Sequence, residues 1–462
     1  MKTVDAFKLI LQIEDLYNIN IFSWKGLGTW PLIRKIIWFR LISASHSHKY
    51  KNVKHELKVG SKILSLFSIF KKTKINYESK RIFFSRPEYL QEVGGQKFVD
   101  RIVDPIIELS ELKKTSKYYF RKIPRDKKMI ISHYEMTNKL SYTYIYIDKN
   151  QISILNQIAK LIQIDNLELE KEYRKELHTL SQWFNSAKKL LFKHKSLTEI
   201  YVTCWYTTET MGICAAAKLL GIQTIDIQHG KQGQYQAMYS GWTKIPEGGY
   251  DLMPNKFWCW GKPSCDHILK HSPHRKYHIP FVGGFPWIDY YKKNIMIEDS
   301  TQSNNIRVLM TLQPPQGDNL ERIPDFILRF LSSEHAENIH FIFRLHPNDS
   351  HGFSYCLDRL KLITANTYTI DVGKRNLYDL FSESTHHITA YSSCSYEAFH
   401  FGIPTLLYGS ESKEIYKQEI EEKVFSWTNS NIDDLINWLN SKSSNRLNTH
   451  HTYIEDTNVK FR

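Results

Sequence analysis

Cysteine is scarce in this chain of 462 residues, and none of its six cysteines forms a C-x-x-C pair. This pattern argues against a disulfide framework and a structural zinc site, and it is typical of a reducing compartment. No uncharged apolar run reaches the roughly 18 residues that a membrane-spanning helix needs. Residues 1–15 also lack the apolar core of a signal peptide. We therefore expect a cytoplasmic protein.

Common catalytic motifs are missing as well. The chain has neither a G-x-x-x-x-G-K-[ST] loop nor a G-x-G-x-x-G turn that opens a helix, which argues against P-loop hydrolysis and NAD chemistry. It has no H-E-x-x-H motif and no carboxylate cluster typical of a catalytic metal site. We therefore expect neither a metal nor a cofactor.

Acidic residues are outnumbered, because Lys and Arg exceed Asp and Glu by 14. An excess of this size favours an acidic partner such as nucleic acid, anionic lipid or a phosphorylated substrate, although a solvated basic surface is the simpler alternative. No nucleic-acid-binding motif accompanies the charge, so we do not expect a nucleic acid partner.

Short apolar runs alternate with helical periodicity through most of the chain, which predicts an α/β fold with parallel sheets. The pattern is clearest in residues 307–440, which form a C-terminal domain of their own. Expected strands there span 307–311, 340–345, 368–372, 387–390 and 405–407. Polar residues 294–306 indicate a linker, so residues 1–293 form the N-terminal domain. Residues 441–462 are a polar tail that we expect to fray.

The first 78 residues are basic and aromatic. Pro31 suits the first position of a helix, and the pattern predicts that helix over residues 31–42. The segment combines tryptophans with cations, namely Trp24, Trp30, Trp38, Lys25, Arg34, Lys35 and Arg40. Such a helix can lie in a lipid interface, which would make the protein peripheral on the inner face of the cell membrane. The alternative is a helix packed on the domain core.

Three polar motifs come directly after predicted strands, where open α/β sheets bind ligands. The last of them, S-S-C-S-Y-E from Ser392, opens a helix. Because a helix start attracts anions, the hydroxyls of Ser392, Ser393 and Ser395 either cap the helix or bind a phosphate. Glu397 either caps the helix or accepts a hydrogen bond from a ribose hydroxyl.

The middle motif is R-L-H-P at residues 344–347. Pro347 ends the strand and restricts His346 to an extended backbone, which helps to fix the imidazole at the sheet edge. An imidazole there can bond a phosphate oxygen or protonate a leaving group.

The first motif is Q-H-G at residues 228–230. Gly230 permits a tight turn or the close approach of a ligand. His229 either binds substrate, joins a catalytic relay or bonds within its own turn. Since His229 belongs to the first domain and His346 to the second, joint action of the two predicts a cleft between the domains.

A general base is also expected near this edge. Glu209 lies one strand–helix unit before His229, so its loop should open on the same edge of the sheet. It is the first candidate for the base, unless it is simply a favourable partner for its helix dipole. Asp100 and Glu92, in the loop after the predicted strand 81–85, are the rivals.

The three motifs, in this order and at these distances, resemble those of bacterial capsule and surface-polysaccharide glycosyltransferases. That group has the GT-B fold of two facing Rossmann-like domains with a cleft between them, and it is similar to Kdo transferases, sialyl- and polysialyltransferases and the polyol-phosphate polymerases of teichoic acid synthesis. The W-P-L-I-R segment at residues 30–34 also resembles capsule enzymes. The resemblance covers residues 201–409.

The resemblance implies roles for the residues of these motifs. His346 would bind the donor phosphate and help the leaving group to depart, Ser392 and Ser393 would hold the same phosphate, and Glu397 would contact the ribose. Similar enzymes use CMP-activated acidic sugars and need no metal. The D/E-D/E-G motif that supplies the base in sialyltransferases is not found here, so the base stays open among the candidates above.

The expected function is an inverting, metal-independent glycosyltransferase. It would move a CMP-activated acidic keto-sugar, such as Kdo, a sialic-acid-like sugar or another nonulosonate, to a glycan or glycolipid acceptor of a capsule or surface polymer. One alternative is a CDP-polyol phosphotransferase of the teichoic-acid type, in which His229 and His346 would form the acid–base pair. Another is a non-catalytic subunit of a capsule assembly complex.

Overall fold

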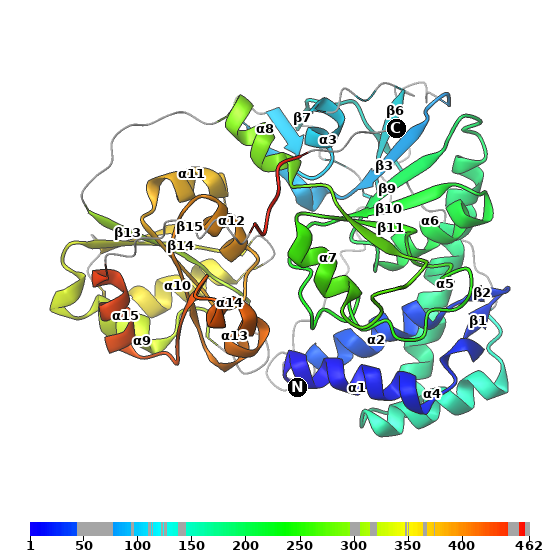
Figure 1. Cartoon of the computed structure of the whole chain (residues 1–462), viewed down its shortest axis with the longest axis horizontal. Coiled ribbons are helices and arrows are strands. Elements are labelled where there is room, and N and C mark those ends of the chain that lie inside the picture. Colours follow the sequence, from blue (N-terminus) through cyan, green and yellow to red (C-terminus); the bar gives the residue numbers. More distant parts are fainter. Residues whose placement is uncertain are drawn as a thin grey trace, which may run out of the picture.

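The computed structural model describes residues 1–43, 77–93, 97–109, 112, 114–121, 123, 127–136, 145–295, 305–314, 321–346, 349, 351–363, 367–373, 375–441 and 452–457. They form two α/β lobes (Figure 1), each built on its own large parallel sheet. The predicted α/β class with two Rossmann-like domains is therefore confirmed.

The C-terminal domain contains a six-stranded parallel sheet in the order β15-β14-β13-β16-β17-β18. Its strands are β13 (Ile306–Thr311), β14 (Ile339–Arg344), β15 (Tyr368–Asp371), β16 (His386–Thr389), β17 (Thr405–Tyr408) and β18 (Ser426–Thr428). In chain order this is the 3-2-1-4-5-6 arrangement of a Rossmann fold. The short β18 was not expected from the sequence, because three residues carry almost no pattern.

The helices of this domain follow its strands. They are α9 (Asp325–Leu331), α10 (Gly352–Leu360), α11 (Leu377–Glu383), α12 (Cys394–His400), α13 (Ser410–Ile415), α14 (Lys417–Glu421) and α15 (Ile432–Asn440). Val308 and Met310 of β13 point into one hydrophobic cluster, and Leu309 points into another on the opposite face. This alternation is what a strand covered on both faces requires.

The N-terminal domain repeats the same order with one more strand, β12-β11-β10-β9-β3-β6-β8, again all parallel. Its strands are β3 (Arg81–Ser85), β6 (Thr115–Tyr119), β8 (Tyr134–Glu135), β9 (Glu199–Thr203), β10 (Gln223–Ile227), β11 (Lys256–Cys259) and β12 (Ile279–Val282). The order reverses between β3 and β9, and the carboxyl ends at such a point are where open α/β sheets bind ligands.

Further elements surround this sheet. A small side sheet contains β4 (Leu90–Glu92), β5 (Lys97–Asp100) and β7 (Lys128–Met129), and a hairpin pairs β1 (Ser23–Trp24) with β2 (Leu27–Gly28). The helices are α1 (Thr3–Leu16), α2 (Trp30–Ser43), α3 (Asp104–Leu109), α4 (Lys149–Leu161), α5 (Asn166–Leu191), α6 (Thr208–Leu219), α7 (Lys262–Leu269) and α8 (Pro286–Asn294).

Helix α2 corrects the prediction of a membrane-binding face at the start of the chain. Trp24, Trp30 and Trp38 are all buried, and the Arg34 side chain is inaccessible to solvent. Their apolar surface is already covered by the domain core, so these residues do not form such a face. The alternative of a helix packed on the core is therefore confirmed. No helix among the described residues is long and apolar enough to cross a membrane.

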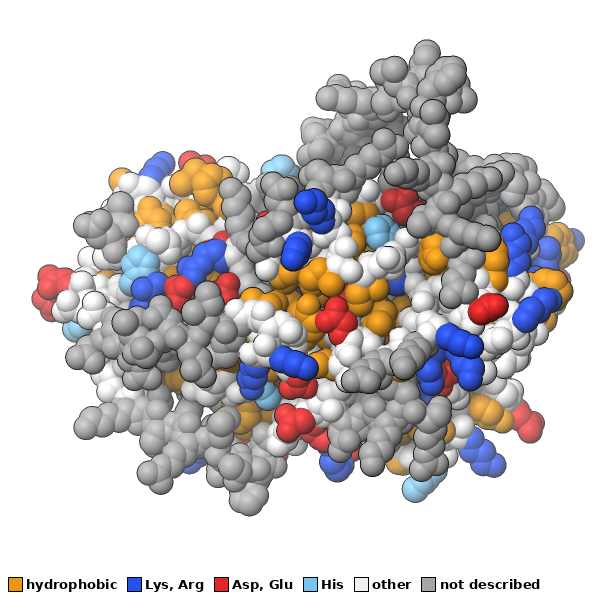
Figure 2. Space-filling view, turned by 90° about the horizontal axis from the view of Figure 1, so that it is seen from above, with side chains coloured by type: hydrophobic (Ala, Val, Ile, Leu, Met, Phe, Trp, Pro, Cys, Tyr) orange, Lys and Arg blue, Asp and Glu red, His pale blue; other side chains and the backbone are white. Residues whose placement is uncertain are grey.

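The two domains share one hydrophobic cluster, which includes Trp258 and Trp287 of the first and Tyr378 and Leu407 of the second. In a view from above, apolar side chains gather near the middle of the face, with lysines and arginines among and around them (Figure 2). Helix α8 closes the first domain, and β13 opens the second. Residues 296–304 of the predicted linker lie outside the described residues.

Residues 452–457 form a strap that returns to the first domain, so the expected frayed tail is wrong for this segment. Tyr453 is buried and stacks on Tyr396 of α12, with ring centroids 4.8 Å apart. The Glu455 backbone N–H donates to the Trp260 carbonyl over 2.9 Å. A Cβ at Gly261 would lie 2.6 Å from the Tyr453 carbonyl oxygen, so this contact requires glycine. The strap (red in Figure 1) runs between the lobes.

Candidate functional site

The Q-H-G motif forms a fixed turn at the end of β10. The Gln228 side chain donates to the Gly230 carbonyl over 2.9 Å and accepts from the Trp260 backbone N–H over 2.7 Å. The Trp260 indole donates in turn to the Gln228 carbonyl over 3.0 Å. Gln228 is therefore a buried structural residue. Its hydrogen bonds fix the turn that positions the side chain of His229 at the end of β10.

His229 lies against two tyrosines at the sheet edge. Its ring centroid is 5.8 Å from that of Tyr89 and 6.1 Å from that of Tyr206. Burial lowers the pKa of His229 to about 4, and the positive charges of Arg86 and Arg101 lower it further, while the Ile227 backbone opposes the shift. The imidazole is therefore neutral at neutral pH and can accept a proton.

Arg86 and Arg101 are site residues that the sequence analysis missed. Arg86 directly follows β3, at the reversal point of the first sheet, and it hydrogen-bonds the Cys204 sulfur. Arg101 directly follows β5. The position of Arg86 after a predicted strand was a usable signal. Arg101 follows a strand of the side sheet that no pattern predicted.

The R-L-H-P motif combines a structural arginine with a half-buried histidine. Arg344 forms an ion pair with Asp371 of the neighbouring strand and donates to the Arg375 carbonyl over 2.8 Å. His346 follows, and its side chain is half-buried. Burial lowers the pKa of His346, Arg101 lowers it as well, and Asp349 opposes both. Pro347 lies outside the described residues.

The serine-rich motif opens α12 as expected. The Ser392 hydroxyl accepts from the Cys394 backbone N–H over 3.2 Å, while Ser393 occupies the N-cap position without a side-chain capping bond. The Ser395 hydroxyl is fully buried and donates to the Ser392 carbonyl over 2.9 Å. Of the three predicted phosphate ligands, Ser395 thus uses its hydroxyl in a hydrogen bond within the second domain. Ser393, by contrast, is half-buried and makes no capping bond.

Glu397 is buried below the start of α12. Its Oε2 accepts a hydrogen bond of 2.6 Å from the Tyr378 hydroxyl. Burial raises the pKa of Glu397, whereas the Tyr378 bond and the charge of Arg101 oppose that rise. The predicted contact of Glu397 with a ribose therefore stays a prediction. The Tyr378 hydroxyl already occupies one oxygen of this carboxylate.

The three carboxylates considered for the general base lie in different surroundings. Asp100 accepts from two backbone N–H groups and from the Tyr119 hydroxyl, so it holds the start of α3 in place. Glu92 is exposed at the end of β4. Glu209 lies half-buried in the first turn of α6, and no hydrogen bond or ion pair joins it to another described residue. No hydrogen bond or ion pair joins any of these three described residues to His229.

Lys231 connects the two halves of the site. It follows the Q-H-G turn, and its ammonium lies 3.1 Å from the centroid of the Tyr416 ring in the second domain. The Tyr416 hydroxyl donates to the Ser392 carbonyl over 2.7 Å. Burial lowers the pKa of Lys231 to about 7, and Glu419 opposes the shift. The loops of His229 and Ser392 are thus coupled through two side chains.

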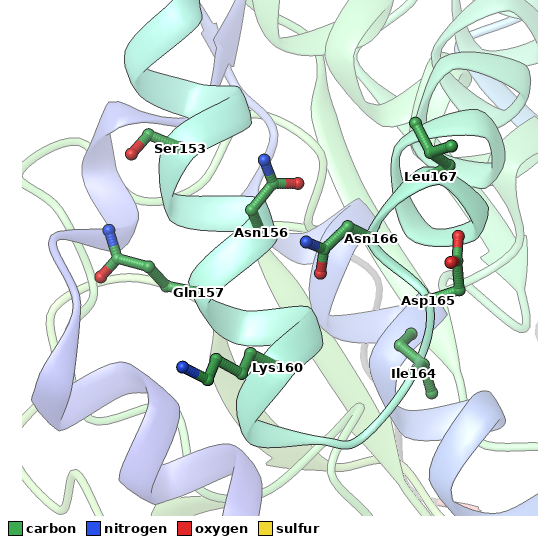
Figure 3. A pocket seen from close by; sticks show the side chains of 8 residues that line it. All are labelled: Ser153, Asn156, Gln157, Lys160, Ile164, Asp165, Asn166 and Leu167. Carbon is green, nitrogen blue, oxygen red and sulfur yellow. The ribbon is translucent and has the colours of Figure 1, made fainter.

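One surface hollow of the molecule lies away from the strand-end residues, and another pocket includes two residues beside them. A hollow between α4 and the start of α5 is lined by Ser153, Asn156, Gln157, Lys160, Ile164, Asp165, Asn166 and Leu167 (Figure 3). It contains none of the strand-end residues. A smaller pocket between the domains is lined by Gln228 and Lys231 together with Tyr396 and Tyr453. No group of three or more His, Cys, Asp or Glu side chains among the described residues could hold a metal ion.

Among known proteins, the matches to this chain are solved structures of similar fold. No family model and no curated protein matches the chain. Solved structures that resemble it include S. aureus MnaA with UDP (13% identity, covering 78% of this chain and 86% of that chain, TM-score 0.45). Others are UDP-GlcNAc 2-epimerase from Neisseria meningitidis bound to UDP-GlcNAc (16%, 78% and 89%, 0.46) and the glycosyltransferase SnogD from Streptomyces nogalater (11%, 78% and 91%, 0.45). Values this low say nothing about the substrate of this chain, so its chemistry has to follow from its own residues.

Proposed function

We propose that this protein is a nucleotide-sugar-dependent transferase whose second domain binds the donor and whose first domain binds the acceptor. The observation that carries the proposal is the meeting of the two strand edges at Arg101. This one guanidinium acts electrostatically on His229 of the first domain and on His346 and Glu397 of the second. A group transferred between ligands on the two edges would pass beside these side chains.

On the donor side, His346 and the Ser392–Ser393 turn would hold the phosphate of the leaving nucleotide. Because the pKa of His346 is lowered, its ring acts at neutral pH as a neutral N–H donor. The Ser393 hydroxyl makes no capping bond and is available to a phosphate oxygen. Hydrogen bonds to the departing phosphate stabilise the charge that develops there.

On the acceptor side, His229 is the base that the geometry favours. The acceptor hydroxyl would attack the anomeric carbon of the donor sugar as its proton passes to the neutral imidazole. The bond from that carbon to the phosphate oxygen breaks, and the nucleotide leaves with the bonding electrons. A single displacement of this kind inverts the anomeric centre. Glu209 stays a candidate for the base without a described contact to His229.

The donor we propose is a CMP-linked acidic keto-sugar, such as Kdo or a sialic-acid-like sugar, and the acceptor is a capsule or surface glycan. The resemblance of the three motifs supports this choice, and the net charge of +14 suits acidic ligands. Titration calorimetry with CMP, CDP, UMP and UDP tests it. We expect CMP to bind, and binding to weaken when Ser392 and Ser393 are both replaced by Ala.

Turnover provides the second part of this test. We expect His346→Ala to lose at least about 100-fold in turnover of the CMP-sugar in a folded protein, the scale of losing one charge-stabilising or acid–base group. The matched control is His335→Ala, because His335 is exposed in the same domain. Near-normal turnover of His346→Ala would contradict its role, and a wild type that binds no nucleotide would favour a non-catalytic subunit.

A further inference from the structure

Two arginines are held next to each other at the edge of the first sheet by the backbone of Tyr89. The Tyr89 N–H donates to the Arg86 carbonyl over 3.1 Å, and the Arg101 N–H donates to the Tyr89 carbonyl over 3.1 Å. The segment after β3 and the segment after β5 are therefore tied together. Both arginine side chains are half-buried.

Neither of these two guanidiniums is paired with a carboxylate of the described residues. Within the described part of the chain, no carboxylate forms an ion pair with either of them, whereas Arg34, Arg81 and Arg344 are each paired with one. Tyr89 and Cys204, on which Arg86 acts electrostatically, are neutral at neutral pH. Burial raises the pKa of Tyr89 well above its usual value and that of Cys204 to about 12.

The acidic groups that interact electrostatically with Arg101 or its neighbours, Glu397 and Asp226, accept hydrogen bonds from other residues. Burial raises the pKa of Glu397, and Tyr378 occupies one of its oxygens. Burial raises the pKa of Asp226 well above its usual value, and its oxygens accept from the Tyr239 hydroxyl and the Trp205 N–H. Two half-buried positive charges without an ion pair carry a desolvation cost that an acidic ligand would offset.

We propose that Arg86 and Arg101 form an oxyanion site on the first domain, opposite His346, which binds an acidic group of the substrate other than the phosphate attached to the nucleoside. Guanidinium groups suit this task because they bind carboxylate or phosphate through paired N–H donors. The position opposite the donor phosphate rests on the proposed function, whereas the affinity for an oxyanion does not. The group is either a carboxylate of an acidic sugar or the second phosphate of a nucleoside diphosphate.

Such a site would couple ligand binding to the state of His229. The charges of Arg86 and Arg101 contribute to the low pKa of this ring, and the other titratable groups that face it, Tyr89 and Tyr206, are neutral. An anion on the arginines offsets their charge, so the pKa of His229 rises toward its ordinary value. Substrate binding would thereby strengthen the base.

The test measures three probes by titration calorimetry: CMP, CDP and N-acetylneuraminic acid as a free acidic sugar. The variants are Arg86→Gln, Arg101→Gln and the double variant, with Arg329→Gln as the control because Arg329 is exposed on α9. We expect each single variant to weaken one acidic probe by about 10-fold or more, with CMP affinity unchanged. Loss of the sugar acid identifies a carboxylate as the ligand, and selective loss of CDP identifies the second phosphate.

Other outcomes would overturn the site. Unchanged affinity for both acidic probes in the double variant would exclude it, and an equal loss of CMP would place the arginines at the first phosphate. A fall in melting temperature in both single variants, as for a paired structural arginine, would also contradict it, because removing an uncompensated charge should not destabilise the fold. If the wild type bound the sugar acid through the arginines but no nucleotide, the oxyanion site would stand while the proposed function failed.

Discussion

Two histidines show how single residues of this chain are held neutral inside the core. The Nε2 atom of His278 accepts from the Tyr250 backbone N–H over 2.8 Å, which requires the neutral ring. His387 lies between the hydroxyls of Thr311 and Thr405, 2.9 and 3.1 Å away. Burial lowers the pKa of His278 to about 4 and that of His387 to about 3.

These histidines predict a loss of stability in mild acid. In the unfolded chain a histidine binds its proton below a pH of about 6.5. The folded rings stay neutral until the pH reaches their own lower pKa values. Each ring therefore removes up to about 1.4 kcal/mol of the free energy of unfolding per pH unit as the pH falls from about 6.5 toward 4.

Urea unfolding at about pH 7 and about pH 5 measures this effect. We expect His387→Asn to reduce the difference between the two pH values, because the variant has no ring to protonate in the unfolded state. His335→Asn, at an exposed position, should leave the difference unchanged. An equal difference in the His387 variant and the wild type would contradict the prediction.

At the scale of elements, α2 is held by a buried charged network. Arg34 forms an ion pair with Glu14 of α1 and donates to the carbonyls of Ala237 and Ser240 over 2.9 and 2.8 Å. Its guanidinium lies 4.1 Å from the centroid of the Trp242 ring. Arg34, one of the cations predicted to bind a membrane surface, is thus used within the first domain.

We expect Arg34→Met to lower the free energy of unfolding by about 3–5 kcal/mol, because it leaves the Glu14 carboxylate buried without its partner. Arg40→Met is the control on the same helix. Its ion pairs with Glu168 and Glu172 are partly exposed, so its loss should cost about 1 kcal/mol or less. Urea denaturation compares the two, and similar costs for both would show that Arg34 is not structural. Binding of the folded wild type to anionic vesicles through Arg34 would contradict the buried network.

At the scale of the whole molecule, the strap and the shared hydrophobic cluster make the two lobes one unit. Tyr453 packs on Tyr396 and Phe399 of the second domain, with ring centroids 4.8 and 5.7 Å apart. Next to it, Glu455 accepts from the Lys262 backbone N–H over 3.0 Å. The strap therefore contacts both domains beside the pocket lined by Lys231.

Replacing Tyr453 by Ala should lower the free energy of unfolding by about 3 kcal/mol, the lower range for removing a buried aromatic ring. We also expect weaker binding of a nucleotide, because the strap helps to hold the two edges of the site in register. Thr452→Ala is the control, since this neighbouring side chain is exposed. A Tyr453 variant as stable as the control would show that the strap does not join the domains.

The sequence alone determined the fold class and the three motifs, because both follow from local patterns. Apolar runs of strand length that alternate with helical periodicity require two covered parallel sheets. His229, His346 and Ser392 then follow strands by position in the chain alone. The proline after His346 and the glycine after His229 are equally local signals.

Only the tertiary structure decided which charged groups lie close to one another and which are occupied by internal ion pairs or hydrogen bonds. Arg101 follows a strand of the side sheet, yet its charge acts on His346 and Glu397 of the second domain, and no local pattern encodes that approach. The sequence makes Asp100 a candidate for the general base. In the structure its oxygens accept hydrogen bonds from the backbone before α3 and from the Tyr119 hydroxyl. The basic residues of α2 predict a membrane surface from the sequence, whereas in the structure Arg34 is paired with Glu14 of α1. Periodicity reports which face of an element is apolar, whereas the partner that covers that face depends on contacts between distant parts of the chain.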